Sequence, residues 1–335
     1  TVSGFSKSRG VSKWLLPEAL ASVDDWQLQG ILAVNGGQIG FRGLDARGAD
    51  SAGLQLRARG EGIFGDPQQP QPFSSLDLLL DIDSDNTEAA LYLLIEKLPE
   101  VGPVQGSARL TAPAGDQFAI EDYQIEVGRK QELYTVYTGR IGHIPVAGER
   151  PTSGIDIHIS RTAARTGQLG RVFDVTLPEI GPVAYSGRFV GSEKDGVFKD
   201  LSLTAGAEKA LQLKVRGQLQ MGDARTGEPP KSIDLAVTVA SPETAPIAQL
   251  TGSALPQLGP VKGRFKLTGR LQNMQVSEID IAAGHPDTLT LSARGGIEKL
   301  LFEPKISFNG VRLDLSAVSP SSARFLPLLG LGTAD

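Results

Sequence analysis

The chain has 335 residues, 40 of them glycine, no cysteine, and a formal net charge of −5 at pH 7. Glycine is well above its average usage of about 7%, so the sequence predicts many turns and strand ends. The lack of cysteine excludes thiol catalysis, thiolate metal sites and disulfides, and the acidic balance disfavours nucleic acid as a partner. No apolar run reaches about 18 residues, so no transmembrane segment is expected in this chain.

A repeat of about 78 residues organises the sequence. The strings LPEVGPV, LPEIGPV and LPQLGPV begin at Leu98, Leu177 and Leu255, and LPLLG at Leu326 resembles the start of a further copy. Two series of glycines keep the same spacing: Gly48, Gly128, Gly206 and Gly284, then Gly60, Gly139, Gly217 and Gly295. We therefore expect residues 1–335 to form one repeat array, with repeats at 16–97, 98–176, 177–254 and 255–325, and the start of another at 326–335.

Within each copy, apolar residues alternate with polar ones and predict short strands. In chain order the clearest expected strands are 54–60, 75–83, 153–160, 211–217, 232–239, 263–269, 278–284, 289–295 and 306–315. An aspartate follows the second glycine at one constant interval in three copies, at Asp77, Asp156 and Asp234; the last copy is expected to be shorter, with Ser307 in that place. Helix-like stretches are expected at 83–97, 160–173, 241–250 and 319–326, with helices of about ten residues and N-caps at Ser84, Ser160, Ser241 and Ser319.

The expected fold class is mainly β, with about four antiparallel strands and one short helix per repeat. About sixteen strands would each present apolar side chains on one face, and four short helices are too few to cover them. The apolar surface must therefore meet itself in a closed, dry core, or meet a ligand. The residues alone leave these two possibilities open.

The LPxhGPV unit, followed by four alternating strands and a short helix, resembles the repeats of the AsmA-like proteins, which belong with TamB among the bridge-like lipid-transfer proteins of the Gram-negative envelope. The resemblance covers the chain from about Leu16 to its end. It implies a long sheet curled into a taco-like groove, a periplasmic location, and membership of a larger protein anchored in the inner membrane. The family often has five strands per unit, and a fifth could lie in GRVFDVTL, residues 170–177.

This resemblance implies a non-enzymatic protein that carries phospholipid or another acyl lipid along an apolar groove between inner and outer membranes. The expected lining residues are Leu76, Leu78, Leu80, Ile155, Ile157, Ile159, Ile233, Leu235, Val237, Ile306 and Phe308, with Leu110, Phe189 and Leu267. The alternative is a structural or assembly scaffold that acts through contacts with other envelope proteins. Crosslinking at the loop residues Pro229 and Glu149 would distinguish it.

No catalytic residue, cofactor or metal is expected. The three histidines occupy unrelated repeat positions, and Asp81, Asp83 and Asp85 are better explained by an acidic helix N-terminus than by calcium. The recurrent aspartates are interpreted as outward polar positions. The basic residues Arg57, Arg59, Lys214, Arg216 and Arg294 indicate either a solvated strand face or a rim for anionic headgroups.

Overall fold

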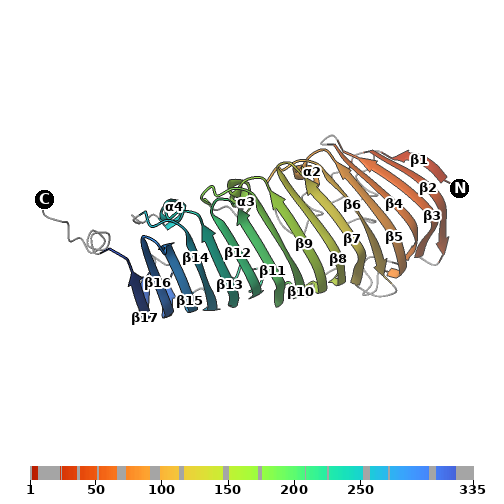
Figure 1. Ribbon diagram of the computed structural model, residues 1–335. Helices are drawn as coiled ribbons and strands as arrows, with labels where there is room; N and C mark the ends of the chain where they lie inside the picture. The colour runs from red at the N-terminus through yellow and green to blue at the C-terminus, as the bar shows by residue number, and fades with distance from the viewer. Residues whose placement is uncertain are drawn as a thin grey trace. The chain divides into compact units, whose positions relative to one another are not determined.

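The computed structural model describes residues 2–6, 23, 25–35, 38–50, 53–65, 73–90, 99–112, 117–145, 151–172, 176–207, 209–224, 226–251, 257–270, 272–301 and 307–321. These residues are mainly β, as expected, with antiparallel strands in open sheet and few helices (Figure 1). The chain divides into two compact units. Unit 1 comprises Thr1–Arg161 and Phe189–Lys194, and unit 2 comprises Thr162–Arg188 and Asp195–Asp335.

Among the described residues, eight strands lie wholly in unit 1: β1 (Val2–Ser6), β2 (Asp25–Asn35), β3 (Gln38–Ala49), β4 (Leu54–Phe64), β5 (Phe73–Ser84), β6 (Val104–Ala112), β7 (Gln117–Gly128) and β8 (Leu133–Pro145). Each pairs antiparallel with the next along the chain. The short helix α2 (Thr87–Ala90) lies between β5 and β6 in sequence. The sheet of unit 1 is therefore a meander, in which neighbours in sequence are neighbours in space.

In the described part of unit 2, seven strands lie wholly within the unit: β11 (Gly196–Gly206), β12 (Gln212–Gln220), β13 (Ser232–Ser241), β14 (Val261–Arg270), β15 (Asn273–His285), β16 (Leu289–Leu301) and β17 (Ser307–Val318). They also form an antiparallel meander, with α4 (Ala245–Thr251) between β13 and β14. Strands β9 (Ser153–Ala163) and β10 (Val183–Ser192) have residues in both units, and α3 (Thr166–Val172) lies between them in sequence.

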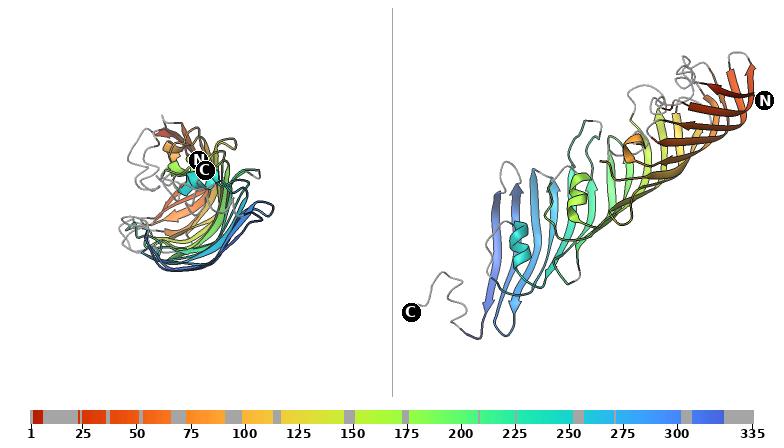
Figure 2. Two further views of the ribbon diagram at one scale, coloured as in Figure 1. Left: turned by 60° about the vertical axis from the view of Figure 1, so that its left-hand side comes forward. Right: turned by 90° about the horizontal axis from the view of Figure 1, so that it is seen from above.

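A β-bulge recurs in the second strand of each group of four. The ladder shifts register within β3, β7, β11 and β15, and each shift includes one residue with positive φ, namely Gly43, Asp122, Asp200 and Glu278. Bulges bend a strand and increase its twist, so a sheet that carries them at regular intervals curves. The strands of unit 2 are visibly arched in the left view of Figure 2.

The second series of glycines marks close contacts between neighbouring strands. A Cβ atom on Gly60, which has φ of +148°, would lie 2.0 Å from the backbone oxygen of Asp77. Gly139 and Gly217 make the same approach to Asp156 and Asp234. The interval from glycine to aspartate is constant because each glycine faces the backbone carbonyl of that aspartate on the next strand. A side chain at the glycine position would push the two strands apart.

The assignment of Ser307 in the last copy is wrong. Gly295 lies against the carbonyl of Arg312, with 2.0 Å between its would-be Cβ and that oxygen, so the interval is the same as in the other copies. The register pairs Gly295 with Leu313, as it pairs Gly217 with Leu235. The start of β17 has the same alternation of apolar and polar residues as the segment around Arg312. The sequence therefore allows either Ser307 or Arg312 at the aspartate position, and only the strand pairing of β16 with β17 selects Arg312.

A repeated polar contact closes the first turn of α2 and α3. Glu100 Oε2 accepts hydrogen bonds from the backbone N–H of Thr87 (2.9 Å) and Glu88 (3.2 Å), and its Oε1 accepts from Gly102 N–H (2.8 Å). The hydroxyl of Thr87 donates to the Gly102 carbonyl at 2.8 Å. A carboxylate is favourable here because the first N–H groups of a helix have no partner within it.

The second copy repeats this helix clasp, and the third changes it. Glu179 accepts from the N–H groups of Thr166, Gly167 and Gly181 at 3.3, 3.4 and 3.1 Å. In the third copy Thr244 is 3% exposed and accepts from Leu258 N–H at 3.2 Å, but the glutamate is replaced by Gln257. The glutamate of the LPE string thus caps the helix, whereas the sequence predicted serine caps.

The expected N-caps at Ser84, Ser160 and Ser241 are wrong, because these serines are strand residues. Strand β9 runs on to Ala163, and Arg161 donates from Nε to Thr135 Oγ1 (2.8 Å) and from Nη2 to the Tyr137 hydroxyl (3.0 Å). Helix α3 consequently begins at Thr166 and has 7 residues instead of about ten. Ser319 is described, but the helix expected after it extends outside the described residues. The fifth strand suggested for 170–177 is not found where this segment is described, because residues 170–172 belong to α3 and residues 176–177 are not strand; residues 173–175 lie outside the described ranges.

Candidate functional site

Apolar side chains line one face of the sheet in unit 2, in rows that run across the strands. One row passes from Leu203 through Val215 and Val237 to Phe265, and each of these residues faces the next across the ladder. Parallel rows contain Leu213, Val239 and Ile281, and Leu201, Leu235, Leu267, Val276 and Ile297. We call this surface the apolar face of unit 2.

The middle of this face is only partly covered. Leu203, Val215, Leu235, Phe265 and Leu267 are half-buried, although they point to the same side as the apolar residues that surround them. Only a few residues of the face, such as Val237 at 6% exposure, are buried. Half-covered apolar side chains in adjacent rows form a surface that gains free energy, on the order of 25 cal/mol per Å², when another apolar group covers it.

The corresponding face of unit 1 is packed more tightly. One of its rows runs from Leu56 through Ile82 and Gly106 to Ile125 and Tyr137. The four residues of this row that have side chains are each 8% exposed or less. A core cluster of buried residues contains Phe41, Leu76, Leu78 and Ala112, with Leu44, Leu80, Leu110 and Phe118 packed against it. Protein atoms therefore cover much of the apolar face of unit 1 from β4 to β8, whereas Ile31, Leu32, Val34 and Ile39 of β2 and β3 are 42–69% exposed.

The predicted lining residues divide accordingly. Leu76, Leu78, Ile155 and Ile157 are 6% exposed or less, so protein atoms already cover them. Leu80, Leu110, Ile159, Phe189, Leu235 and Leu267 are half-buried, and Ile233 and Val237 are buried. Phe308 is 64% exposed in β17, and Ile306 lies outside the described residues.

Three apolar residues of β17 were missed. Val311, Leu313 and Leu315 stand opposite Ile297, Gly295 and Ala293 and continue the rows of the apolar face. Their exposures are 43%, 38% and 76%. The signal that could have found them was present in the sequence, since Leu313 follows Gly295 at the same interval at which Leu235 follows Gly217.

Unit 1 also contains a cleft of about 880 Å³ across β2 to β5. Its lining combines Trp26, Leu56 and Ile82 with polar residues from flanking positions, among them Gln27, Gln55 and Asp83. The buried indole Nε1 of Trp26 has no hydrogen-bond acceptor among the described residues. Arg47, Arg57 and Asp81 also line it, so charged side chains border the cleft.

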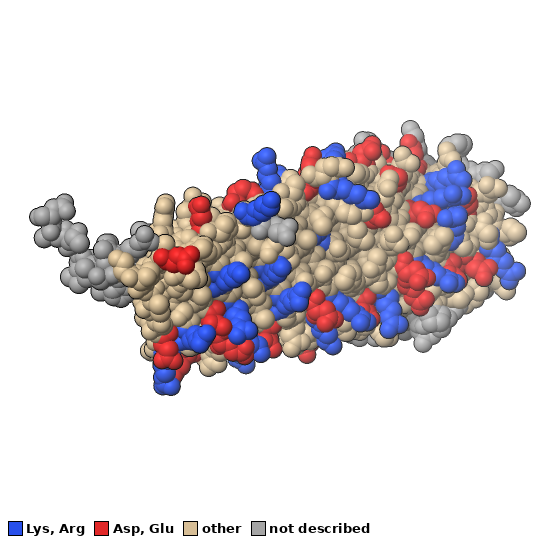
Figure 3. All heavy atoms as spheres, in the orientation of Figure 1, with Lys and Arg blue, Asp and Glu red and all other residues tan. Residues whose placement is uncertain are grey.

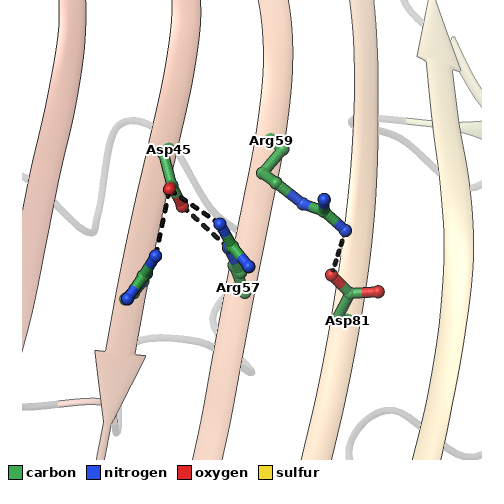
Figure 4. A network of polar contacts seen from close by, with 5 residues as sticks. Asp45, Arg57, Arg59 and Asp81 are labelled. Atoms are coloured by element: carbon green, nitrogen blue, oxygen red, sulfur yellow. Dashed lines mark hydrogen bonds and ion pairs between the residues drawn. The ribbon is translucent and has the colours of Figure 1, made fainter.

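The opposite, polar face of unit 1 is covered by ion pairs between neighbouring strands (Figure 4). Arg57 on β4 donates to both carboxylate oxygens of Asp45 on β3, at 2.9 and 2.8 Å, and Arg59 contacts Asp81 on β5 at 2.7 Å. The hydrogen bonds from Arg57 hold the pKa of Asp45 well below its usual value. Asp77 is bound by Arg109, which lowers the pKa of Asp77 in the same way.

These contacts settle the positions of several acidic residues. Asp81 and Asp83 lie on strand β5 and contact Arg59 and Gln105, so the interpretation of both as charges of a helix N-terminus is wrong. The recurrent aspartates Asp77 and Asp234 point outward and pair with cations of the next strand, Arg109 and Lys266. Within the described ranges, no three histidine, aspartate or glutamate side chains come close enough together to hold a metal ion.

Comparison of the chain with protein-family models, with curated proteins and with solved structures finds no match. None of the helices in the described part of the chain has the length and apolar character needed to cross a membrane.

Proposed function

We propose that this protein is a non-enzymatic lipid-binding segment, and that it holds the acyl chains of a phospholipid or similar lipid against the apolar face of unit 2. The observation that carries the proposal is the set of half-buried rows through Val215, Phe265 and Leu235. A lipid chain lying across them would remove apolar surface from water on both partners. Its headgroup would stay in solvent at the edge of the sheet, and no covalent step would be involved.

The wider setting follows from the resemblance to AsmA-like and TamB-type proteins. In that setting the curved sheets would form a taco-like groove, and the chain would be a periplasmic segment of a larger, inner-membrane-anchored protein that carries lipid between the two membranes. The one-array organisation of residues 1–335 belongs to this proposal. Lipid would move passively, because an apolar surface has no directional chemistry of its own.

Photocrosslinking tests the proposal at two adjacent residues on opposite faces. Leu235 lies on the apolar face, and its neighbour Ala236 is exposed on the polar face. A photoreactive residue at position 235, introduced into protein purified from cells without detergent, should crosslink to lipid that mass spectrometry identifies. The same residue at position 236 is the matched control and should not.

A third site makes the test sharper. Ile157 is 1% exposed, so a photoreactive side chain there should crosslink to the protein itself rather than to lipid. Absence of lipid at position 235, or equal lipid crosslinking at positions 235 and 236, would contradict the proposal. Substitution of Leu267 by aspartate should in addition reduce the lipid that copurifies, since a carboxylate is costly to place against acyl chains.

The scaffold alternative has its own support in unit 1. The buried cluster around Leu76 and Leu78 is covered by other side chains of unit 1, as is typical of a rigid structural sheet. Crosslinking from Pro229, in the loop between β12 and β13, tests that alternative; trapping of one defined protein there would favour it. Glu149, the other loop site, lies outside the described residues.

A further inference from the structure

The polar face of unit 2 carries a group of five cations on two strands. Lys214 and Arg216 point outward from β12, and Lys262, Arg264 and Lys266 point outward from β14. Strand β13 lies between them, and the residues that it presents on this face are small or short: Asp234, Ala236, Thr238 and Ala240. We call this arrangement the basic channel. In Figure 3, several basic side chains over unit 2 stand apart from acidic ones.

The dimensions of the basic channel follow from the ladder. Lys214 and Arg264 face each other across Thr238, and Arg216 and Lys266 face each other across Ala236. Two strand spacings separate the rows by about 10 Å, and cations two residues apart on one strand are about 7 Å apart. The cations therefore form two rails above a floor of small side chains, with room for one extended polypeptide.

The same positions in unit 1 are electrically balanced. Arg59 faces Asp45 across the β3–β4 ladder, whereas its counterpart Arg216 faces Ser202. Asp45 binds Arg57 and Arg47, so the loss of this acid in unit 2 leaves its β12 cations without that partner.

The β5 and β6 positions differ in the same direction. Arg57 faces Asp81, whereas its counterpart Lys214 faces Thr238. The places of Lys262 and Arg264 are taken in unit 1 by the neutral residues Gln105 and Ser107, which face Asp83 and Asp81. Each of these differences removes an acid from unit 2 or adds a cation to it.

Two acids remain at the margin of the channel. Asp234 lies 3.4 Å from Lys266, and Asp280 on β15 contacts both Arg264 (3.1 Å) and Arg294 (3.2 Å). Within the described part of unit 2, no ion pair is found for Lys214, Arg216 or Lys262. The channel therefore has a clear positive excess in a chain whose net charge is −5.

We propose that the basic channel binds an extended acidic polypeptide segment, which lies over β13 with its carboxylates directed towards the cations on both sides. Side chains i and i+2 of an extended peptide are about 7 Å apart, which matches the spacing of the cations along each rail. A membrane of anionic lipids would also be attracted by the charge, but its headgroups have no fixed spacing and gain nothing from two rails with a recessed floor. This site is on the opposite face from the lipid surface proposed above and does not depend on it.

Two peptides of equal charge test the spacing. One has glutamate at every second position among threonines, and the other has glutamate at every third position, with four glutamates in each. Fluorescence anisotropy with the whole chain at low salt should show that the alternating peptide binds about tenfold more tightly, since it can engage several cations at once. Binding should weaken as salt is added.

Matched double variants locate the site. Lys214→Gln with Arg216→Gln should weaken binding of the alternating peptide by about tenfold or more. Arg57→Gln with Arg59→Gln changes the same number of charges at the equivalent positions of unit 1 and should leave binding within about twofold, because those arginines are already neutralised by aspartates.

Three results of the peptide experiments would overturn the proposal. They are no measurable binding of the alternating peptide, equal affinity for the two peptides, and equal weakening by the two double variants. Vesicles containing anionic phospholipid provide the competing surface. If they displace the peptide and their binding is lost in the Lys214 and Arg216 double variant, the channel is a membrane contact and the peptide assignment is wrong.

Discussion

The helix clasp provides a prediction whose size can be worked out from the structure. Glu100→Gln keeps the shape of the side chain but removes its charge and replaces one of its two accepting oxygens with an NH₂ group. Glu100 accepts three backbone hydrogen bonds at 2.8 to 3.2 Å, from Thr87, Glu88 and Gly102. At least one of these bonds is lost, and the others no longer have a charged acceptor.

We expect this change to lower the free energy of unfolding by about 2 kcal/mol. A hydrogen bond to a charged group contributes about 1.5–3 kcal/mol against about 1 for a neutral one, and the helix end adds about 0.3–1 kcal/mol. The loss of one bond to a charged acceptor, together with the helix-end contribution, therefore gives about 1.8–4 kcal/mol. The site is partly exposed to solvent, which places the expected loss at the lower end of these values. For a unit of this size, 1 kcal/mol corresponds to a fall of about 2–4 °C in Tm.

Differential scanning calorimetry of three further variants provides the controls. Glu179→Gln should also lower stability, by somewhat less, because Glu179 accepts hydrogen bonds from the three equivalent N–H groups at longer distances of 3.1 to 3.4 Å. Glu88→Gln removes a charge from the first turn of α2 but no clasp bond, and should cost only a few tenths of a kcal/mol. Gln257→Glu should raise stability, since it places the missing carboxylate beside α4. Equal effects of Glu88→Gln and Glu100→Gln would refute the hydrogen-bond explanation, and a loss of stability in Gln257→Glu would refute the equivalence of the three clasps.

Three further predictions concern unit 1. Gly60→Ala should destabilise by about 3 kcal/mol in urea unfolding, because its Cβ would lie 2.0 Å from a carbonyl oxygen, whereas Gly40→Ala has 3.8 Å of room and should be tolerated; equal effects would count against the close-contact explanation. Burial, with a hydrogen bond to Glu126, raises the pKa of Tyr134 to about 12 from 10.0, so this stabilisation should be complete below pH 10 and lost as pH rises towards 12; an absorbance titration with all tyrosines ionising near 10 would contradict it. The lowered pKa of Asp45 means that its ion pair stabilises the fold above about pH 4, and this stabilisation should be lost as pH falls below that value. Asp45→Asn should therefore reduce the loss of stability at acid pH, and an unchanged loss would exclude this ion pair as its source.

Much of the β architecture could be read from local pattern. Alternation in segments such as 211–217 and 232–239 places every second side chain on one face, and the observed strands β12 and β13 cover nearly all of these segments. The spacing of Gly60, Gly139 and Gly217 is also a structural constant, because a residue that touches the next strand cannot be moved without moving the whole register. Short-range periodicity and steric exclusion are both properties that a sequence carries directly.

Other features depended on which segments meet. The sequence assigned Ser307 to the position facing Gly295, which Arg312 occupies. Both residues lie in segments of alternating apolar and polar residues, and only the pairing of β17 with β16 distinguishes them. It placed helix caps at serines, whereas Glu100 and Glu179 reach the helix ends from 12 or 13 residues away. The arginines of unit 1 and the lysines of unit 2 looked alike in sequence, and only the neighbouring strands showed which cations are neutralised.

What the sequence determined by itself is therefore the strands and the two-faced character of the sheet, because each depends on residues close together in the chain. The tertiary structure decided how far each apolar face is covered and how each cation is partnered. Leu78 and Leu235 occupy equivalent places after Gly60 and Gly217, yet the first is 4% exposed and the second half-buried. Burial and charge compensation are set by side chains from other strands, and those distances are not encoded in any local pattern.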